Sequence, residues 1–77
     1  MTKNYMIHIH HVRSGEKWSS EIQTLGVDEV LKLKMHIINL LTDGSYFSLK
    51  NVSGVYIFPK EVLRESVVRI EEVEEKI

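Results

Sequence analysis

The chain lacks cysteine, holds a single proline and has no long hydrophobic run. Without cysteine it can form neither disulfide bonds nor thiolate metal sites. No stretch approaches the roughly 18 consecutive apolar residues that mark a membrane-spanning helix. The N-terminal segment reaches polar His8 and His10 too early for a signal peptide. We therefore expect a cytoplasmic protein that makes no contact with a membrane.

An excess of charge is also absent, because the net charge is −1 at pH 7. Residues 1–60 contain seven Lys and Arg against five Asp and Glu, and residues 61–77 contain three against six. Neutralisation of phosphates dominates affinity for nucleic acid, and an imbalance this small is typical of a charged rim. The composition therefore argues against nucleic acid as the partner.

What remains is the composition of an ordinary folded protein, with 43% hydrophobic and 27% charged residues. A chain of this length forms one small domain that buries only about 60% of the surface it exposes when unfolded. Without disulfides, association is the usual remaining source of stability. We predict a single domain over residues 1–77 that forms a homo-oligomer, a dimer or larger.

Residues 27–42 have the clearest periodic pattern, and we predict that they form the helix on which the rest of the chain packs. At 100° per residue, one face collects six apolar residues, which we expect to be buried: Val27, Val30, Leu31, Met35, Ile38 and Leu41. Three more, Leu33, Ile37 and Leu40, widen this face. Residues 31–37 also alternate strictly between apolar and polar, as a half-buried strand does. If residues 30–42 are a strand instead, the chain becomes a small all-β barrel.

The flanking segments predict strands. Residues 5–25 read as a β-hairpin in which Ile7 and Ile9 share one face and His8 and His10 the other. The returning strand is predicted to run regularly over residues 17–25, with Leu25 on its solvent-facing side. Residues 46–73 read as a β-meander, interrupted at residues 59–63 by a short helical turn. The order is therefore ββαβββ, an α+β fold with one helix packed on an antiparallel sheet, whose other face a second copy could cover.

The C-terminal half resembles small uncharacterised proteins of Gram-positive bacteria (Firmicutes) and their phages. The resemblance covers residues 47–52, 55–63 and 68–73, and it follows the spacing of strands and turns rather than a functional motif. It therefore implies no role for any residue. It implies a phage or prophage origin, and with it an interaction with a host factor or a small ligand in the host cytoplasm.

His8 and His10 are candidate metal ligands, because two imidazoles on one strand face can hold zinc. No further ligand stands at a diagnostic spacing, so we interpret them as polar side chains of the strand face and predict no cofactor. A metal-dependent enzyme built on this pair is kept as a lesser alternative. No serine has the context of a nucleophile, and the four glycines are dispersed among turns. The sequence therefore indicates that the protein is not an enzyme.

Aromatic residues beside basic ones form the remaining candidate binding residues. They are Trp18 next to Lys17, and Tyr56 close to Lys60, and with His8 and His10 they complete the predicted set. Nucleic-acid bases stack on such rings, although aromatic residues in strands are more often part of the core. Our leading hypothesis is a non-enzymatic binding protein that recognises a protein partner or a small anionic ligand. The alternative is a small nucleic-acid-binding module.

Overall fold

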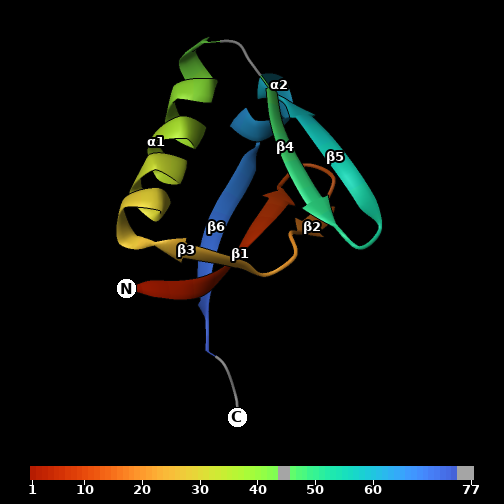
Figure 1. Ribbon diagram of the computed structural model, residues 1–77. Helices are drawn as coiled ribbons and strands as arrows, with labels where there is room; N and C mark the ends of the chain where they lie inside the picture. The colour runs from red at the N-terminus through yellow and green to blue at the C-terminus, as the bar shows by residue number, and fades with distance from the viewer. Residues whose placement is uncertain (44–45, 75–77) are drawn as a thin grey trace.

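The computed structural model describes residues 1–43 and 46–74, and Figure 1 shows the arrangement of its elements. In chain order these are β1 (Thr2–His11), β2 (Lys17–Ser19), β3 (Gln23–Gly26), α1 (Val27–Asp43), β4 (Tyr46–Asn51), β5 (Gly54–Pro59), α2 (Lys60–Arg64) and β6 (Ser66–Val73). The predicted α+β fold is confirmed, with one main helix packed on antiparallel strands. The alternative of an all-β barrel is wrong, because residues 30–42 are helical. Neither described helix has the length and apolar content to cross a membrane.

Strand β1 is the centre of a four-stranded antiparallel sheet, which we call sheet A. Along one edge it pairs first with β2, with Ile9 opposite Trp18, and then with β3, with Asn4 opposite Thr24. Its residues 4–11 also pair with β6, which must therefore lie along the other edge. The first strand of the chain thus pairs with the last one, and this long-range pairing closes the fold.

The returning strand of the first hairpin is broken by a bulge between β2 and β3. Three residues separate Ser19 from Gln23, whereas only two separate their partners on β1, His8 and Tyr5. The extra residue reverses the alternation of side chains. Leu25 consequently lies opposite Lys3, on the same face as Ile7, and is half-buried. The predicted regular strand with Leu25 facing solvent is therefore wrong.

Ser20 fills the bulge and is almost completely buried. Its hydroxyl accepts a hydrogen bond from the Ile7 amide at 2.9 Å and donates one to the Glu21 carbonyl at 2.8 Å. The Glu21 amide in turn donates to the carbonyl of Lys50 in β4 at 3.0 Å. The bulge therefore satisfies the backbone of β1 and attaches the second hairpin to sheet A.

Strands β4 and β5 form a separate two-stranded sheet, which we call sheet B. Strand β6 pairs with β1 and not with β5, so the predicted meander over residues 46–73 is wrong at its third strand. The reason lies at Pro59, which has no N–H to donate and ends the ladder of β5. Helix α2 follows directly, buries Leu63 in the core and carries the chain to sheet A.

The core lies between the inner face of sheet A, helix α1 and sheet B. It contains Ile7, Ile9, Ile37, Leu40, Phe47, Leu49, Phe58 and Leu63. The predicted face is correct only in part. Val30 is buried and Leu41 is half-buried, but Ile38 at its centre is 56% exposed. The buried side of the helix is centred instead on the residues that widened that face, Ile37, which is 9% exposed, and Leu40. Burying the predicted face would have placed Lys34 near its middle, and removing an unpaired ammonium from water is costly. In the observed orientation Lys34 is exposed, and Leu31 and Met35 are exposed with it.

Candidate functional site

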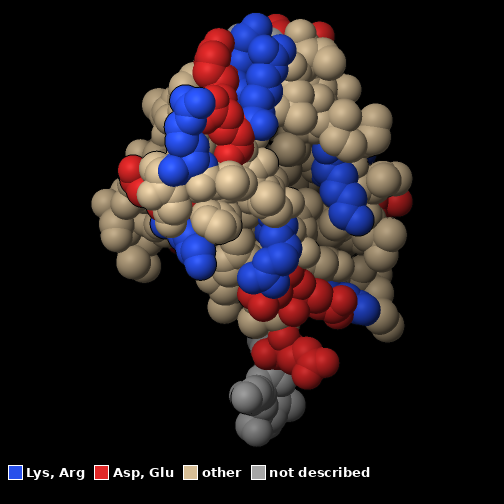
Figure 2. Space-filling model, turned by 180° about the vertical axis from the view of Figure 1, so that it is seen from behind, with Lys and Arg blue, Asp and Glu red and all other residues tan. Residues whose placement is uncertain are grey.

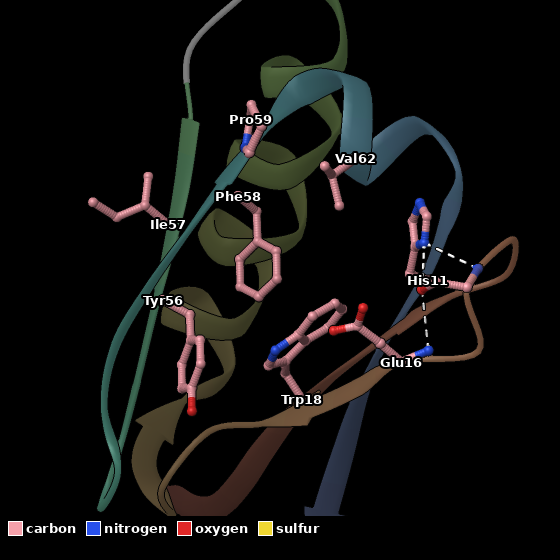
Figure 3. Close-up of a pocket in the computed structure, with 9 residues that line it drawn as sticks. His11, Glu16, Trp18, Tyr56, Ile57, Phe58, Pro59 and Val62 are labelled. Atoms are coloured by element: carbon pink, nitrogen blue, oxygen red, sulfur yellow. Dashed lines mark hydrogen bonds between the residues drawn. The ribbon is translucent and has the colours of Figure 1, made fainter.

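A groove with a volume of about 300 Å³ lies between β5 and the turn that joins β1 to β2 (Figure 3). Its lining consists of His11, Ser14, Glu16, Trp18, Tyr56, Ile57, Phe58, Pro59 and Val62. Four of these residues are consecutive in β5. Because neighbouring side chains of a strand point to opposite faces, such a run means that the edge of β5 itself forms one wall.

The backbone of β5 is unpaired along this edge. The carbonyl of Lys50 in β4 accepts from Glu21 and therefore points away from β5. Lys50 lies opposite Val55, so this pair belongs to the non-hydrogen-bonded positions of the ladder. Because hydrogen-bonded and non-hydrogen-bonded pairs alternate along the ladder, Ile57 also belongs to a non-hydrogen-bonded pair. The N–H and C=O groups of Val55 and Ile57 thus point to the free edge, where within residues 1–43 and 46–74 they meet no backbone partner.

Aromatic rings form the floor of the groove. Trp18 and Phe58 meet edge to face, with ring centroids 5.0 Å apart and planes at 75°. Figure 3 shows Phe58 pointing toward Trp18 and Tyr56 on the same side of β5, while Ile57 points to the other side of the strand. Phe58 is buried, whereas Trp18 and Tyr56 are half-buried. The structure therefore brings together two of the predicted binding residues, Trp18 and Tyr56, from distant parts of the chain.

The opposite wall is polar and held by hydrogen bonds. The His11 amide donates to the carbonyl of Glu16, and the Gly15 amide donates to the carbonyl of His11, both at 2.9 Å. The Nδ1 atom of His11 lies 2.7 Å from the Ser14 hydroxyl, and its Nε2 atom lies 3.3 Å from a carboxylate oxygen of Glu65. Gly15 has a φ of 77°, which glycine adopts without strain. The turn therefore gives the groove a fixed second side.

Three of the other predicted residues lie on the outer face of sheet A. His8, His10 and Lys17 line a hollow of about 240 Å³ there, together with Arg69 and the rim of Trp18. Lys60 belongs to neither lining and follows the groove residue Pro59 at the start of α2. Sequence reasoning thus grouped residues that the structure divides between two sites. It missed His11 and Phe58, although Phe58 shares the face of Tyr56 by simple alternation.

His8 is fixed by two neighbours. Its Nδ1 atom lies 2.7 Å from the Ser19 hydroxyl, and its Nε2 atom lies 2.9 Å from a carboxylate oxygen of Glu71. Since the carboxylate of Glu71 can only accept, Nε2 donates to it, and in the neutral ring Nδ1 accepts from Ser19. Across residues 1–43 and 46–74, no group of three or more His, Asp or Glu side chains is placed to hold a metal ion.

Opposite charges alternate on the surface. Arg69 lies 3.6 Å from Glu71, and Lys3 lies 3.1 Å from Glu72. Figure 2 shows basic side chains scattered over the face seen from behind, mostly beside acidic ones, and acidic side chains gathered at its lower end, without a continuous basic tract. A nucleic-acid backbone requires such a basic tract, so this face offers it no footprint.

The pair of His8 and Glu71 predicts an acid-sensitive contribution to stability. The hydrogen bond from His8 lowers the pKa of the Glu71 carboxyl, and the positive charge of Arg69 lowers it further. A group with a depressed pKa in the folded state stabilises the fold above its unfolded pKa, and this contribution is lost as the pH falls through the folded value. We expect the melting temperature to fall below about pH 4.3, the ordinary glutamate pKa, and to fall less in Glu71→Gln. Thermal melts between about pH 6 and pH 3 measure this, and parallel curves for the two proteins would contradict it.

Comparisons of the chain with protein-family models, with curated proteins and with solved structures found no match. The resemblance of its C-terminal half to small proteins of Gram-positive bacteria and their phages stays a prediction. Any assignment of function therefore comes from the two surfaces described above.

Proposed function

We propose that the protein is a non-enzymatic binding protein that takes an extended segment of a partner protein along the free edge of β5. The observation that carries this proposal is the coincidence of an unpaired strand edge with an aromatic groove. Val55 and Ile57 offer backbone donors and acceptors at the same place where Trp18 and Tyr56 offer half-buried rings. A bound strand would use both, because its backbone gives affinity and its alternate side chains give specificity.

The shape of the groove favours one strand over a broad surface. On one side stands β5, and on the other stands the hydrogen-bonded turn that contains His11 and Glu16. Side chains of the bound segment that point inward would lie against Trp18, Tyr56 and Val62, so we expect apolar or aromatic residues at alternate positions. Pro59 ends the donor row of β5, which limits the paired segment to a few residues.

The other predicted ligands have weaker support. A small anionic ligand could use Lys17 and Arg69 in the hollow on the outer face of sheet A. There, however, Glu71 lies within 3.6 Å of Arg69 and within 2.9 Å of His8, so an acid already occupies the neighbourhood. Bases of nucleic acid could stack on Trp18, but the described lining of that groove contains no Lys or Arg to meet their phosphates. A peptide is therefore the ligand that the geometry supports best.

Panning of a random peptide library against the immobilised protein tests the proposal, followed by titration of the selected peptides. We expect enrichment of peptides with alternating apolar residues, and fluorescence changes of Trp18, the single tryptophan of the chain, on binding. Tyr56→Ala should weaken binding about tenfold or more, because aromatic residues at the centre of an interface dominate its energy.

The matched control is Tyr46→Ala, which removes an exposed ring from β4, and it should leave the affinity unchanged. Equal affinities for both variants would contradict the location of the site. A library that yields no enriched peptide would contradict the function itself.

A further inference from the structure

Strand β6 has a second edge whose backbone is also unpaired. The His11 amide donates to Glu16, and the Ser20 amide donates to the carbonyl of Ile7, so odd-numbered residues of β1 bond toward β2. Even-numbered residues of β1 bond toward β6, as Val12 does with Glu65. With the observed register, the backbones of residues 67, 69 and 71 face β1.

The backbones of Val68, Ile70 and Glu72 consequently point away from sheet A. In the described part of the chain they meet no backbone partner. An edge of this kind is a template for another strand, which soluble proteins must either block or use. Strand β6 has eight residues and contains neither a proline nor a bulge that would block its edge, and its charged residues Arg69, Glu71 and Glu72 would need partners in any pairing.

Two copies of β6 can pair antiparallel about a two-fold axis, and the residue at the axis then faces its own copy. Only one position of this axis brings opposite charges together within β6. With a two-fold axis at Arg69 this residue would face its own copy, and with the axis at Glu71 two glutamates would meet. An axis at Val68 or closer to the N-terminus would run the pairing past the start of β6 at Ser66, and an axis nearer the C-terminus would run it past Val73. With the axis at Ile70, Arg69 lies opposite the partner's Glu71 on both sides of the axis.

We propose that two copies of the chain associate through β6 in this register and form one continuous antiparallel sheet. Ile70 pairs with Ile70 of the partner subunit through both backbone hydrogen bonds, and Val68 pairs with the partner's Glu72. Arg69 and the partner's Glu71 occupy a non-hydrogen-bonded position, where side chains of opposite strands come closest. Val67, which is 57% exposed, covers Val73 of the partner subunit on the same face.

The dimer would leave the peptide groove open, because β2 lies at the opposite edge of β1 from β6. This proposal does not depend on the proposed function, and failure of one leaves the other standing. It gives the predicted homo-oligomer a specific interface, which is the edge of sheet A and not its uncovered outer face.

Charge reversal tests the register. Sedimentation of the unmodified chain should give a mass twice its 9.0 kDa. Arg69→Glu alone places like charges opposite each other at both positions, as does Glu71→Arg alone, and both variants should sediment as monomers. The double variant Arg69→Glu with Glu71→Arg restores opposite charges and should again be a dimer. A mass of 9.0 kDa for the unmodified chain up to about 1 mM would overturn the proposal, and so would single variants that remain dimeric.

Disulfide trapping tests the same register without altering the charges, and it stays informative if a reversed charge harms folding. The chain has no cysteine, so Val67→Cys and Val73→Cys each introduce one thiol. Directly opposed residues at such a position have Cβ atoms about 5 Å apart, which a disulfide can nearly span. An oxidised mixture of the two variants should cross-link. Val67→Cys alone should not, because its two copies would lie about 20 Å apart along the strands. Equal cross-linking in both samples would contradict the register.

Discussion

Replacing Ile37 by alanine is expected to lower the free energy of unfolding by about 2–5 kcal/mol, as truncation of a buried aliphatic side chain does. The same change at the neighbouring Ile38 is expected to cost less than about 0.5 kcal/mol, as at most surface positions. The two residues have the same chemistry and stand in the same helix. They differ in exposure, at 9% for Ile37 and 56% for Ile38.

Urea denaturation of both variants at one protein concentration measures this difference. The cost at Ile37 has two parts, the lost transfer free energy and the cavity left in the hydrophobic core to which this residue belongs. If Ile38→Ala shifts the denaturation midpoint and Ile37→Ala does not, then the helix is centred on the six residues that the sequence predicts to be buried, and the orientation of α1 described above is wrong.

The second large effect is expected at Ser20. In Ser20→Ala the amide of Ile7 loses its acceptor while it remains buried, and leaving a buried donor unsatisfied costs about 1–3 kcal/mol. The carbonyl of Glu21 loses its bond from the same hydroxyl. We therefore expect lower stability together with faster hydrogen exchange of the Ile7 amide.

Ser48→Ala is the matched control, because Ser48 is exposed on the outer face of β4. It should change the stability by less than about 0.5 kcal/mol. Equal stabilities of the two alanine variants would show that the hydroxyl of Ser20 does not support the bulge.

Local patterns in the sequence were sufficient to predict the main helix, the first strand and the short helical turn. Helix α1 follows from the period of its apolar residues, and the alternation of β1 correctly separates Ile7 and Ile9 from His8 and His10. The short helical turn after β5 follows from Pro59, which can end a strand and precede a helix. These features depend on neighbours in the chain, so they are readable without knowledge of the tertiary structure.

The rest depends on contacts between distant segments. The apolar residues of α1 extend round more than half of the helix, so only packing against sheets A and B decides which of them are buried. The bulge is possible because the hydroxyl of Ser20, and not a backbone carbonyl, accepts the hydrogen bond of the Ile7 amide. A serine inside a predicted strand does not by itself indicate a bulge. The pairing of β6 with β1 joins residues more than 50 positions apart, with no local signal.

The candidate site likewise combines features that the local sequence predicts with features that depend on contacts between distant segments. Trp18 and Tyr56 were predicted as binding residues from their chemistry, and the fold places them in one groove. The free edge of β5 could not be predicted, because β5 has this edge only as a result of the pairing of β6 with β1. His8 and His10 were correctly placed on one strand face, where Lys17 joins them, yet the fold separates that face from the groove.

Amide hydrogen exchange of the complex with a selected peptide tests the central claim most directly. Before the peptide is added, Tyr56 and Phe58 should already be protected by β4, while Val55 and Ile57 exchange freely. On binding, protection should appear at Val55 and Ile57. If their exchange is unchanged while the peptide protects amides around Lys17 and Arg69, then the ligand binds the outer face of sheet A and the groove is not the site.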